Sequence, residues 1–252
     1  MRGLRAAASL LTRVKVGGDV RWPEDIAVGL PWFPVVGGAV GCAVAGVYAL
    51  GRPVLPPLVA AAVAVGLGAW LTGAFHEDGL ADTADAFGHR RHADDTRRIL
   101  KDPRLGTYGV VSLVLTMLVR VGAVAALDGG AAFAVLTAAH AMSRAGSLVL
   151  LTGPVAESDG LGSSSATVVA NRHVVAAVGV AAGVGILTVG TVVIPSAAGI
   201  AIVCLGVGRL AWRRIGGVTG DVLGAAQQLG ELVVLLICVS VIAHGWLHIP
   251  WW

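Results

Sequence analysis

Charged side chains are scarce in this chain. They make up 13% of the 252 residues, against about 25% in a soluble domain, and 56% of the residues are hydrophobic. This shortage excludes an ordinary soluble domain and indicates an integral membrane protein. The apolar stretches are about 20 residues long and do not alternate with polar residues, which favours spanning helices over a membrane barrel.

Several functional patterns are missing as well. The three cysteines, Cys42, Cys204 and Cys238, lie in separate apolar runs without metal or disulfide spacing, so we expect buried small side chains there. There is no phosphate loop of the GxxxxGK[ST] type, and Leu80 stands where a zincin helix beginning at His76 requires its second His. No Ser or Cys has a base in a matching motif. The N-terminus has neither the apolar core nor the cleavage site of a signal peptide, and we expect no nucleic-acid partner.

The apolar pattern predicts an all-α polytopic membrane helix bundle with about seven transmembrane helices, forming a single domain over residues 1–252. The expected spans are 26–51, 54–75, 105–127, 130–151, 174–194, 196–212 and 229–249. Pro31 and Pro34 interrupt the first span. Small residues let spanning helices approach closely. The glycines expected to do so are Gly37, Gly41, Gly179, Gly183, Gly216, Gly220 and Gly224.

Lys and Arg set the expected orientation, because they accumulate on the cytoplasmic side. With these spans, 14 of the 18 basic residues fall on one side and only Arg52 on the other. The longer polar loops, 76–104, 152–173 and 213–228, share the basic side. We therefore expect a cytoplasmic N-terminus, with 1–22 as an amphipathic surface segment, and an outside C-terminus. The chemistry then faces the cytoplasm, with 76–104 as the catalytic loop.

Four acids, Glu77, Asp78, Asp82 and Asp85, occur within nine residues and with no base among them. In a helix, the three aspartates fall within roughly a 60° arc of one face. Such carboxylates repel one another unless a cation lies between them, and Mg²⁺ prefers oxygen ligands. We therefore predict Asp78, Asp82 and Asp85 as metal ligands. The alternative is a solvated acidic face followed by positive-inside bases.

Asp221 lies in a second polar stretch, residues 216–231, and is a further candidate metal ligand. Its alternative role is a helix N-cap after Gly220. Bases and glycines after the acid cluster are suited to phosphate. The predicted substrate-binding residues are Arg98, Lys101, Arg104, Gly106, Thr107 and Arg144. Acids for a metal, followed by bases and backbone amides for phosphate, are typical of phosphoryl transfer.

Arg144 is included because an arginine inside a membrane span is a functional candidate by default. His140 lies four residues earlier and therefore shares its helix face. The alternative for Arg144 is snorkelling towards the cytoplasmic edge, and the alternative for His140 is a packing role. Arg120 lies nearer the outer end of its span, and the sequence assigns it no role.

Five stretches resemble the signature regions of the cobalamin synthase family. They are LLTR (10–13), FPVVGGAVG (33–41), GAFHEDGLADTADAFG (73–88), KDPRLGTYGV (101–110) and GDVLGAAQQLGE (220–231). The resemblance implies a Mg²⁺-dependent, multi-pass enzyme of the bacterial cytoplasmic membrane that acts in the final assembly of vitamin B12. Such an enzyme joins adenosylcobinamide-GDP to α-ribazole or its 5′-phosphate and releases GMP. Association with other cobalamin-assembly enzymes is left open.

The family motif matches Asp78, Asp82 and Asp85 residue by residue, which implies catalytic metal binding, although one of them could instead accept the hydroxyl proton. Glu77 occupies a variable position of the motif and receives no role from it. The size of the corrin ring leads us to expect a broad funnel at the cytoplasmic edge.

Parts of the sequence also suggest two other functions. A CDP-alcohol phosphotransferase also uses membrane aspartates, but the Ala-Arg pair of its motif is missing after Asp78-Gly79. A transporter is suggested by Arg120, His140 and Arg144. Against it, no acid is expected at mid-membrane, and the polar residues are concentrated in cytoplasmic loops.

Overall fold

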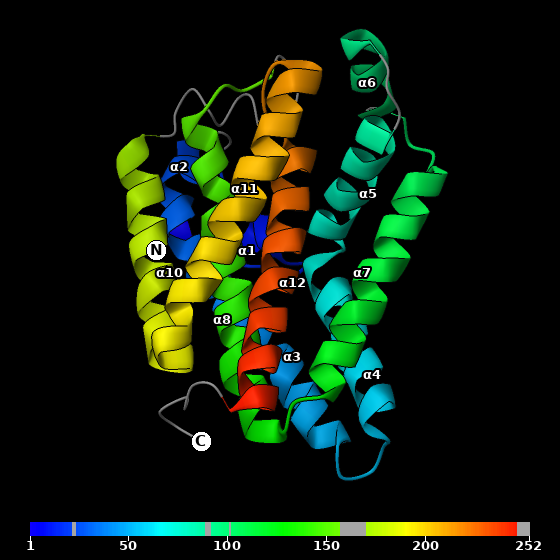
Figure 1. Ribbon diagram of the computed structural model, residues 1–252. Coiled ribbons are helices and arrows are strands. Elements are labelled where there is room, and N and C mark those ends of the chain that lie inside the picture. The colour runs from blue at the N-terminus through cyan, green and yellow to red at the C-terminus, as the bar shows by residue number, and fades with distance from the viewer. Residues whose placement is uncertain (22–23, 89–91, 101, 157–169, 246–252) are drawn as a thin grey trace.

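The chain folds into a bundle of helices, shown by a computed structural model that describes residues 1–21, 24–88, 92–100, 102–156 and 170–245 (Figure 1). The predicted all-α membrane bundle is confirmed, and the β structure of the described residues is a single isolated bridge, Val155–Val218. The α-helices are α1 (Arg2–Leu11), α2 (Glu24–Gly29), α3 (Phe33–Gly51), α4 (Pro57–Thr72), α5 (Phe75–Gly88), α6 (Ala93–Leu100), α7 (Thr107–Ala125), α8 (Gly129–Leu148), α10 (Asn171–Val189), α11 (Val193–Ile215) and α12 (Gly220–His244). Short 3-10 helices are η1 (Leu30–Trp32), η2 (Val149–Thr152) and η3 (Gly190–Val192).

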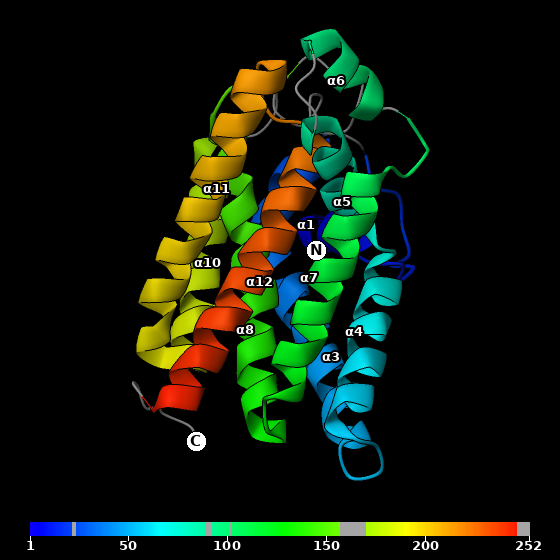
Figure 2. The same cartoon turned by 45° about the vertical axis from the view of Figure 1, so that its right-hand side comes forward.

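Five helical segments within the described ranges are long and apolar enough to cross a membrane, or six if α4 and α5 form one bent span. They are Glu24–Gly51, Thr107–Ala125, Gly129–Thr152, Asn171–Ile215 and Gly220–His244. The fourth of these doubles back, because α10 and α11 run in opposite directions from η3 (Figures 1 and 2). The count of about seven spans is not confirmed and stays a prediction.

The break between α4 and α5 sets the direction of the acidic segment. Gly73 ends α4 in the left-handed conformation (φ 69°), and Ala74 follows with φ 56°. Glycine is the usual residue at such a helix end, because it has no Cβ to clash. The Arg13 amide donates a hydrogen bond of 2.8 Å to the Leu71 carbonyl, so the N-terminal segment is fastened to the bend. Beyond it, α5 leaves at 90° to α4.

The first span is interrupted at the prolines, as the sequence predicts. Pro31 lies in η1, and Pro34 lies in the first turn of α3, where a missing amide hydrogen costs nothing. The amphipathic helix expected within 1–22 is α1. It buries Ala6, Ala7 and Leu11 against the beginning of the first span.

The centre of the bundle is α8, which packs against α3, α10, α11 and α12. Two glycines of α3 make one of these contacts possible, because a Cβ on Gly37 or Gly41 would lie closer than 3.0 Å to the backbone of α8. The prediction of close approach is therefore confirmed for this pair. It is wrong for Gly179 and Gly183, since a Cβ there would meet nothing within 4 Å.

Two polar loops predicted from the sequence contain helices. Residues 76–104 hold most of α5 and all of α6. The last span begins at Gly220 rather than 229, because Thr219 caps α12 by accepting a hydrogen bond of 3.4 Å from the Val222 amide. The polar residues that made 213–228 look like a loop are partly buried inside the bundle, with Gln227 and Gln228 at most 2% exposed.

Replacing Gly41 by Ala should destabilise the protein by roughly 1–3 kcal/mol, because the added methyl group forces α3 away from α8. Thermal unfolding of the purified protein in detergent measures this loss. Gly179→Ala is the matched control, since it adds the same methyl group to a helix where nothing lies nearby. Equal midpoints for the two variants would contradict the role of Gly41.

Candidate functional site

The helix α5 has a buried side and an acidic side. His76, Glu77 and Leu80 are buried, whereas Asp78 is exposed and Asp82 and Asp85 are partly exposed. The predicted helix therefore forms, and its three aspartates turn away from the core while Glu77 turns into it. We call Asp78, Asp82 and Asp85, together with Asp221 of α12, the acidic face.

Asp221 joins the acidic face because two glycines allow α5 and α12 to touch. A Cβ on Gly79 would lie 2.8 Å from the Asp221 carbonyl oxygen, and one on Gly224 would lie 3.3 Å from Gly79. Asp82 consequently lies within electrostatic reach of both Asp78 and Asp221. The N-cap alternative for Asp221 is wrong, because Thr219 caps α12 and leaves Asp221 in its first turn.

Asp85 connects α5 to the beginning of α7. Its Oδ2 accepts a hydrogen bond of 2.7 Å from the Gly106 amide, and its Oδ1 accepts one of 2.9 Å from the Gly109 amide. A carboxylate at this position is favoured by the free amides and the dipole of a helix N-terminus. The Gly106 amide, which we predicted would bind a substrate anion, therefore already has an anionic partner. Thr107, the other predicted substrate-binding residue here, is the first residue of α7.

The donor chemistry of the acidic face suits Mg²⁺. Within the described residues, no group of three or more His, Cys, Asp or Glu side chains is arranged so that it could hold a metal ion. Mg²⁺ does not need one, because it usually takes one or two protein carboxylates and completes its shell with water and substrate phosphate. Asp78, Asp82 and Asp221 form no ion pair with any residue in the described ranges. They are the residues that would hold the ion.

The predicted phosphate-binding bases Arg104 and Arg98 are each bound to an acid outside the acidic face. Arg104 is highly exposed and forms a fork onto Asp102, with Nε 3.0 Å from Oδ1 and Nη2 2.7 Å from Oδ2. Hydrogen bonds from Arg104 lower the pKa of Asp102 to about 2. Arg98 pairs with Asp95 on α6 at 3.1 Å. Lys101 lies outside the described residues. Substrate binding by these three bases stays a prediction.

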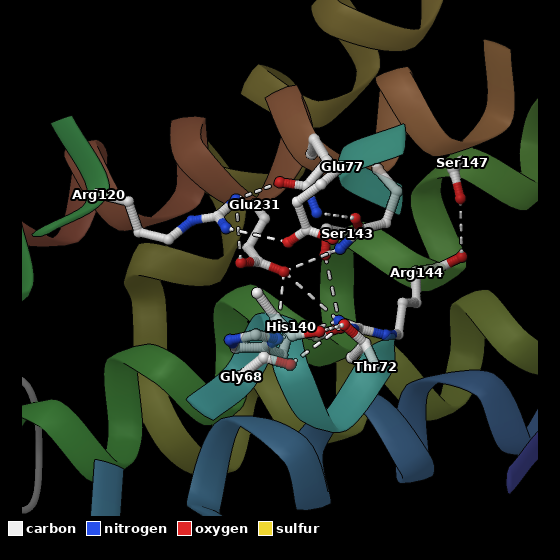
Figure 3. Close-up of polar contacts among 12 residues, drawn as sticks. Gly68, Thr72, Glu77, Arg120, His140, Ser143, Arg144, Ser147 and Glu231 are labelled. Carbon is white, nitrogen blue, oxygen red and sulfur yellow. Dashed lines mark hydrogen bonds and ion pairs between the residues drawn. The ribbon is translucent and has the colours of Figure 1, made fainter. Parts of the chain in front are cut away.

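A second polar cluster lies inside the bundle, and the sequence did not predict it as a unit (Figure 3). Arg120 Nη1 lies 3.5 Å from Glu77 Oε1, and Arg120 Nη2 lies 3.4 Å from Glu231 Oε1. On the other side of Glu231, its Oε2 lies 3.4 Å from Arg144 Nη1 and 3.1 Å from His140 Nδ1. These side chains form a buried ionic network that contains two carboxylates and two guanidinium groups, so its charges balance.

Two glutamines complete the hydrogen bonding of the network. Gln227 Nε2 donates to Ser143 Oγ at 3.0 Å and to Glu231 Oε2 at 2.8 Å, and Arg120 donates to the side-chain oxygen of Gln228. A cavity of about 20 Å³ adjoins Glu77, Arg120 and Glu231. Its volume is enough for about one water molecule. Arg120 Nε and Glu77 Oε2 have no hydrogen-bond partner among the described residues.

The network corrects three expectations. Arg144 is 2% exposed and bonded inside the bundle, so snorkelling is wrong, and it does not lie with the aspartates. An acid does lie midway along a span, because Glu231 is the twelfth of the 25 residues of α12. Arg120, whose role could not be inferred from the sequence, bridges two glutamates. An intramembrane acid opposite two intramembrane arginines was the signal that could have revealed the cluster.

Comparison with known proteins gives a consistent result. A family model described as Cobalamin-5-phosphate synthase matches residues 3–239. A protein of Bradyrhizobium diazoefficiens is 39% identical over 246 residues, covering 94% of this chain and 93% of its own. Relatives from Ralstonia nicotianae (37% identity, 95% of both chains) and Shewanella frigidimarina (35%, 93% of both) are similar over the same extent. All three are named adenosylcobinamide-GDP ribazoletransferase. No solved structure matches.

Replacing Glu231 by Gln should destabilise the protein by about 3–5 kcal/mol, the usual loss when one partner of a buried ion pair is removed. The substitution keeps the shape but leaves Glu77 as the remaining acid for two buried arginines. Thermal unfolding in detergent tests this, with Asp94→Asn as the control, since Asp94 pairs with Arg97 on the exposed surface of α6. A loss no larger than that of the control would contradict a stabilising network.

Replacing Asp85 by Asn should destabilise the protein by about 1–2 kcal/mol, because an amide offers one oxygen to two backbone donors. Asp82→Asn should leave the unfolding midpoint unchanged or raise it, since Asp82 accepts no hydrogen bond from a described backbone amide and is repelled by its neighbours. Differential scanning calorimetry of both variants checks the contrast. Unchanged stability in Asp85→Asn would show that the cap contributes nothing.

Proposed function

The chain belongs to the cobalamin-5-phosphate synthase family, and from this membership we propose that it is the membrane transferase that joins adenosylcobinamide-GDP to α-ribazole or its 5′-phosphate and releases GMP. The observation that carries the proposal is the family match over residues 3–239, which includes the acidic face, the buried ionic network and the beginning of α7. The relatives named adenosylcobinamide-GDP ribazoletransferase cover more than nine tenths of the chain.

In the proposed reaction, a ribose hydroxyl of the ribazole attacks the phosphorus nearest the cobinamide. A new phosphorus–oxygen bond forms, the bond to the bridging oxygen of the diphosphate breaks, and GMP leaves with the bonding electrons. The hydroxyl proton passes to a carboxylate of the acidic face. Asp78, Asp82 and Asp221 are better placed for this role than Asp85, because both oxygens of Asp85 already accept backbone hydrogen bonds.

Mg²⁺ bound at the acidic face would offset the negative charge of the diphosphate and of the leaving GMP. The positions of the aspartates support this assignment, since Asp78 and Asp82 lie on the outer side of α5 and Asp221 comes beside them from α12. The buried Glu77 keeps the aspartates of α5 on the outer side, because rotating the helix about its axis would break the contact between Glu77 and Arg120.

Phosphate binding by Arg104 would need an exchange of partners. In the structure its guanidinium is bound to Asp102, and a substrate phosphate offers the same fork a more highly charged acceptor. Arg104 lies just before the N-terminus of α7, where Asp85 of the acidic face is bound. This proximity supports its role in holding the GDP group, together with Lys101.

We place the acidic face on the cytoplasmic side of the bacterial inner membrane. Support comes from basic residues at one end of the bundle, where α6, the start of α10 with Arg172, and the end of α11 with Arg213 and Arg214 are all found (Figure 1). Arg52 lies at the opposite end, between α3 and α4. This asymmetry fits the positive-inside rule.

Asp82→Asn should lower the rate of GMP release at least 100-fold, the size expected for a metal or electrostatic contribution to phosphoryl transfer. The assay uses purified protein with adenosylcobinamide-GDP and α-ribazole at saturating Mg²⁺, and chelation of Mg²⁺ should abolish the wild-type rate. Asp94→Asn is the control for loss of an acid outside the acidic face. A near wild-type rate in Asp82→Asn would remove this residue from the metal site.

A further inference from the structure

An apolar groove of about 570 Å³ lies between α10 and α11, with α8 and η2 as its floor. The two helices meet at η3 and diverge towards the end of the bundle that carries α6 (Figure 1). Small and aliphatic side chains make the walls, including Ala181 of α10, Ala197 and Ala201 of α11, and Gly146 of α8. None of the lining residues belongs to α5 or α7, so the groove is separate from the acidic face.

The length of the groove matches a membrane. On α11 its lining runs from Val193 to Trp212, which at 1.5 Å per residue is about 28 Å. The hydrocarbon core of a bilayer is about 30 Å thick. Ile202 and Leu205 of α11 are about 70% exposed, so this helix presents apolar surface where lipid tails would lie. An elongated apolar ligand therefore fits the groove better than a compact polar one.

One end of the groove is cationic and aromatic. Arg209 and Trp212 line it there, and the exposed Arg213 follows on the same helix. Arg209 forms no ion pair with a described residue. Residues 160–220 contain four arginines and no acid at all. Tryptophan and arginine at the end of a span are the side chains that meet lipid headgroups at the membrane interface.

We propose that this groove is a binding site for one anionic phospholipid, with an acyl chain between α10 and α11 and its phosphate at Arg209. The apolar walls select the acyl chain, and Arg209, which forms no ion pair with a described residue, selects the negative headgroup. The ligand would also support Asp221 indirectly. Val218, three residues before Asp221, lines the groove. Hydrogen bonds of 3.0 Å to Pro154 and Ala156 hold Val218 to the segment after η2. The site does not depend on which reaction the enzyme catalyses.

The test is thermal unfolding of the delipidated full-length protein in detergent, titrated with three ligands. These are phosphatidylglycerol, phosphatidylcholine with the same acyl chains, and glycerol 3-phosphate. Phosphatidylglycerol should raise the midpoint by roughly 5–10 °C near saturation, and the other two by much less. Equal effects of the two lipids would overturn the selection for negative charge. If glycerol 3-phosphate had an equal effect, the site would bind phosphate alone, and the proposal that it binds a phospholipid would be overturned.

Variants locate the site. Arg209→Gln should weaken phosphatidylglycerol binding roughly five-fold, whereas Lys15→Gln, which removes an exposed base away from the groove, should not. Ala201→Phe fills the groove with a ring and should abolish the lipid-dependent rise, whatever its effect on the midpoint without lipid. Unchanged lipid responses in Arg209→Gln and Ala201→Phe would overturn the site. So would a raised KM for adenosylcobinamide-GDP in Ala201→Phe with the lipid response intact, because the groove would then serve the substrate.

Discussion

Glu231 lies between Arg120 and Arg144 in the middle of the bundle, and the arrangement of four helices depends on this contact. A buried guanidinium group without a counter-charge is very costly, so α7 and α8 must both present their arginines to α12. Glu77 adds the second negative charge from α5 and makes the cluster neutral. Gln227 donates hydrogen bonds to Glu231 and to Ser143, and Gln228 accepts one from Arg120. The result is a fixed rotation for each of the four helices, which hydrophobic packing among so many small, similar side chains would leave poorly defined.

That rotation decides where the acidic face points. Glu77 and Asp78 are neighbours in the chain, and holding the first inside directs the second outwards. Gly79 and Gly224 then let α12 approach closely enough to place Asp221 beside Asp82, and Asp85 fixes the beginning of α7 against α5. Repulsion among these carboxylates works against folding and is tolerated because the surrounding contacts are strong. A bound cation would relieve this repulsion, which connects the stability of the bundle to the proposed reaction.

The two polar clusters therefore have different roles, although both contain Asp or Glu on the same two helices. The buried ionic network is neutral and adjoins a cavity of about 20 Å³, which has room for about one water molecule. The acidic face is open and has a surplus of negative charge. Family membership indicates a transferase, and the open cluster is the one whose chemistry agrees with phosphoryl transfer. The groove between α10 and α11 is separate from both clusters, and we propose that it binds a lipid and takes no part in the reaction.

The sequence by itself determined the membrane class, the helical fold, most of the spans and the common face of Asp78, Asp82 and Asp85, since these follow from local hydropathy and the period of the helix. It also determined the family, because the motif around these aspartates is contiguous. Only the tertiary structure decided that α12 begins at Gly220, that Asp85 caps α7, and that Arg120, Arg144, Glu77 and Glu231 form one network. Residues 213–228 look like a loop because their polar side chains are costly in an apolar helix taken alone. Their partners come from α7 and α8, 108 and 84 residues away in the chain, and no local pattern records such a pairing.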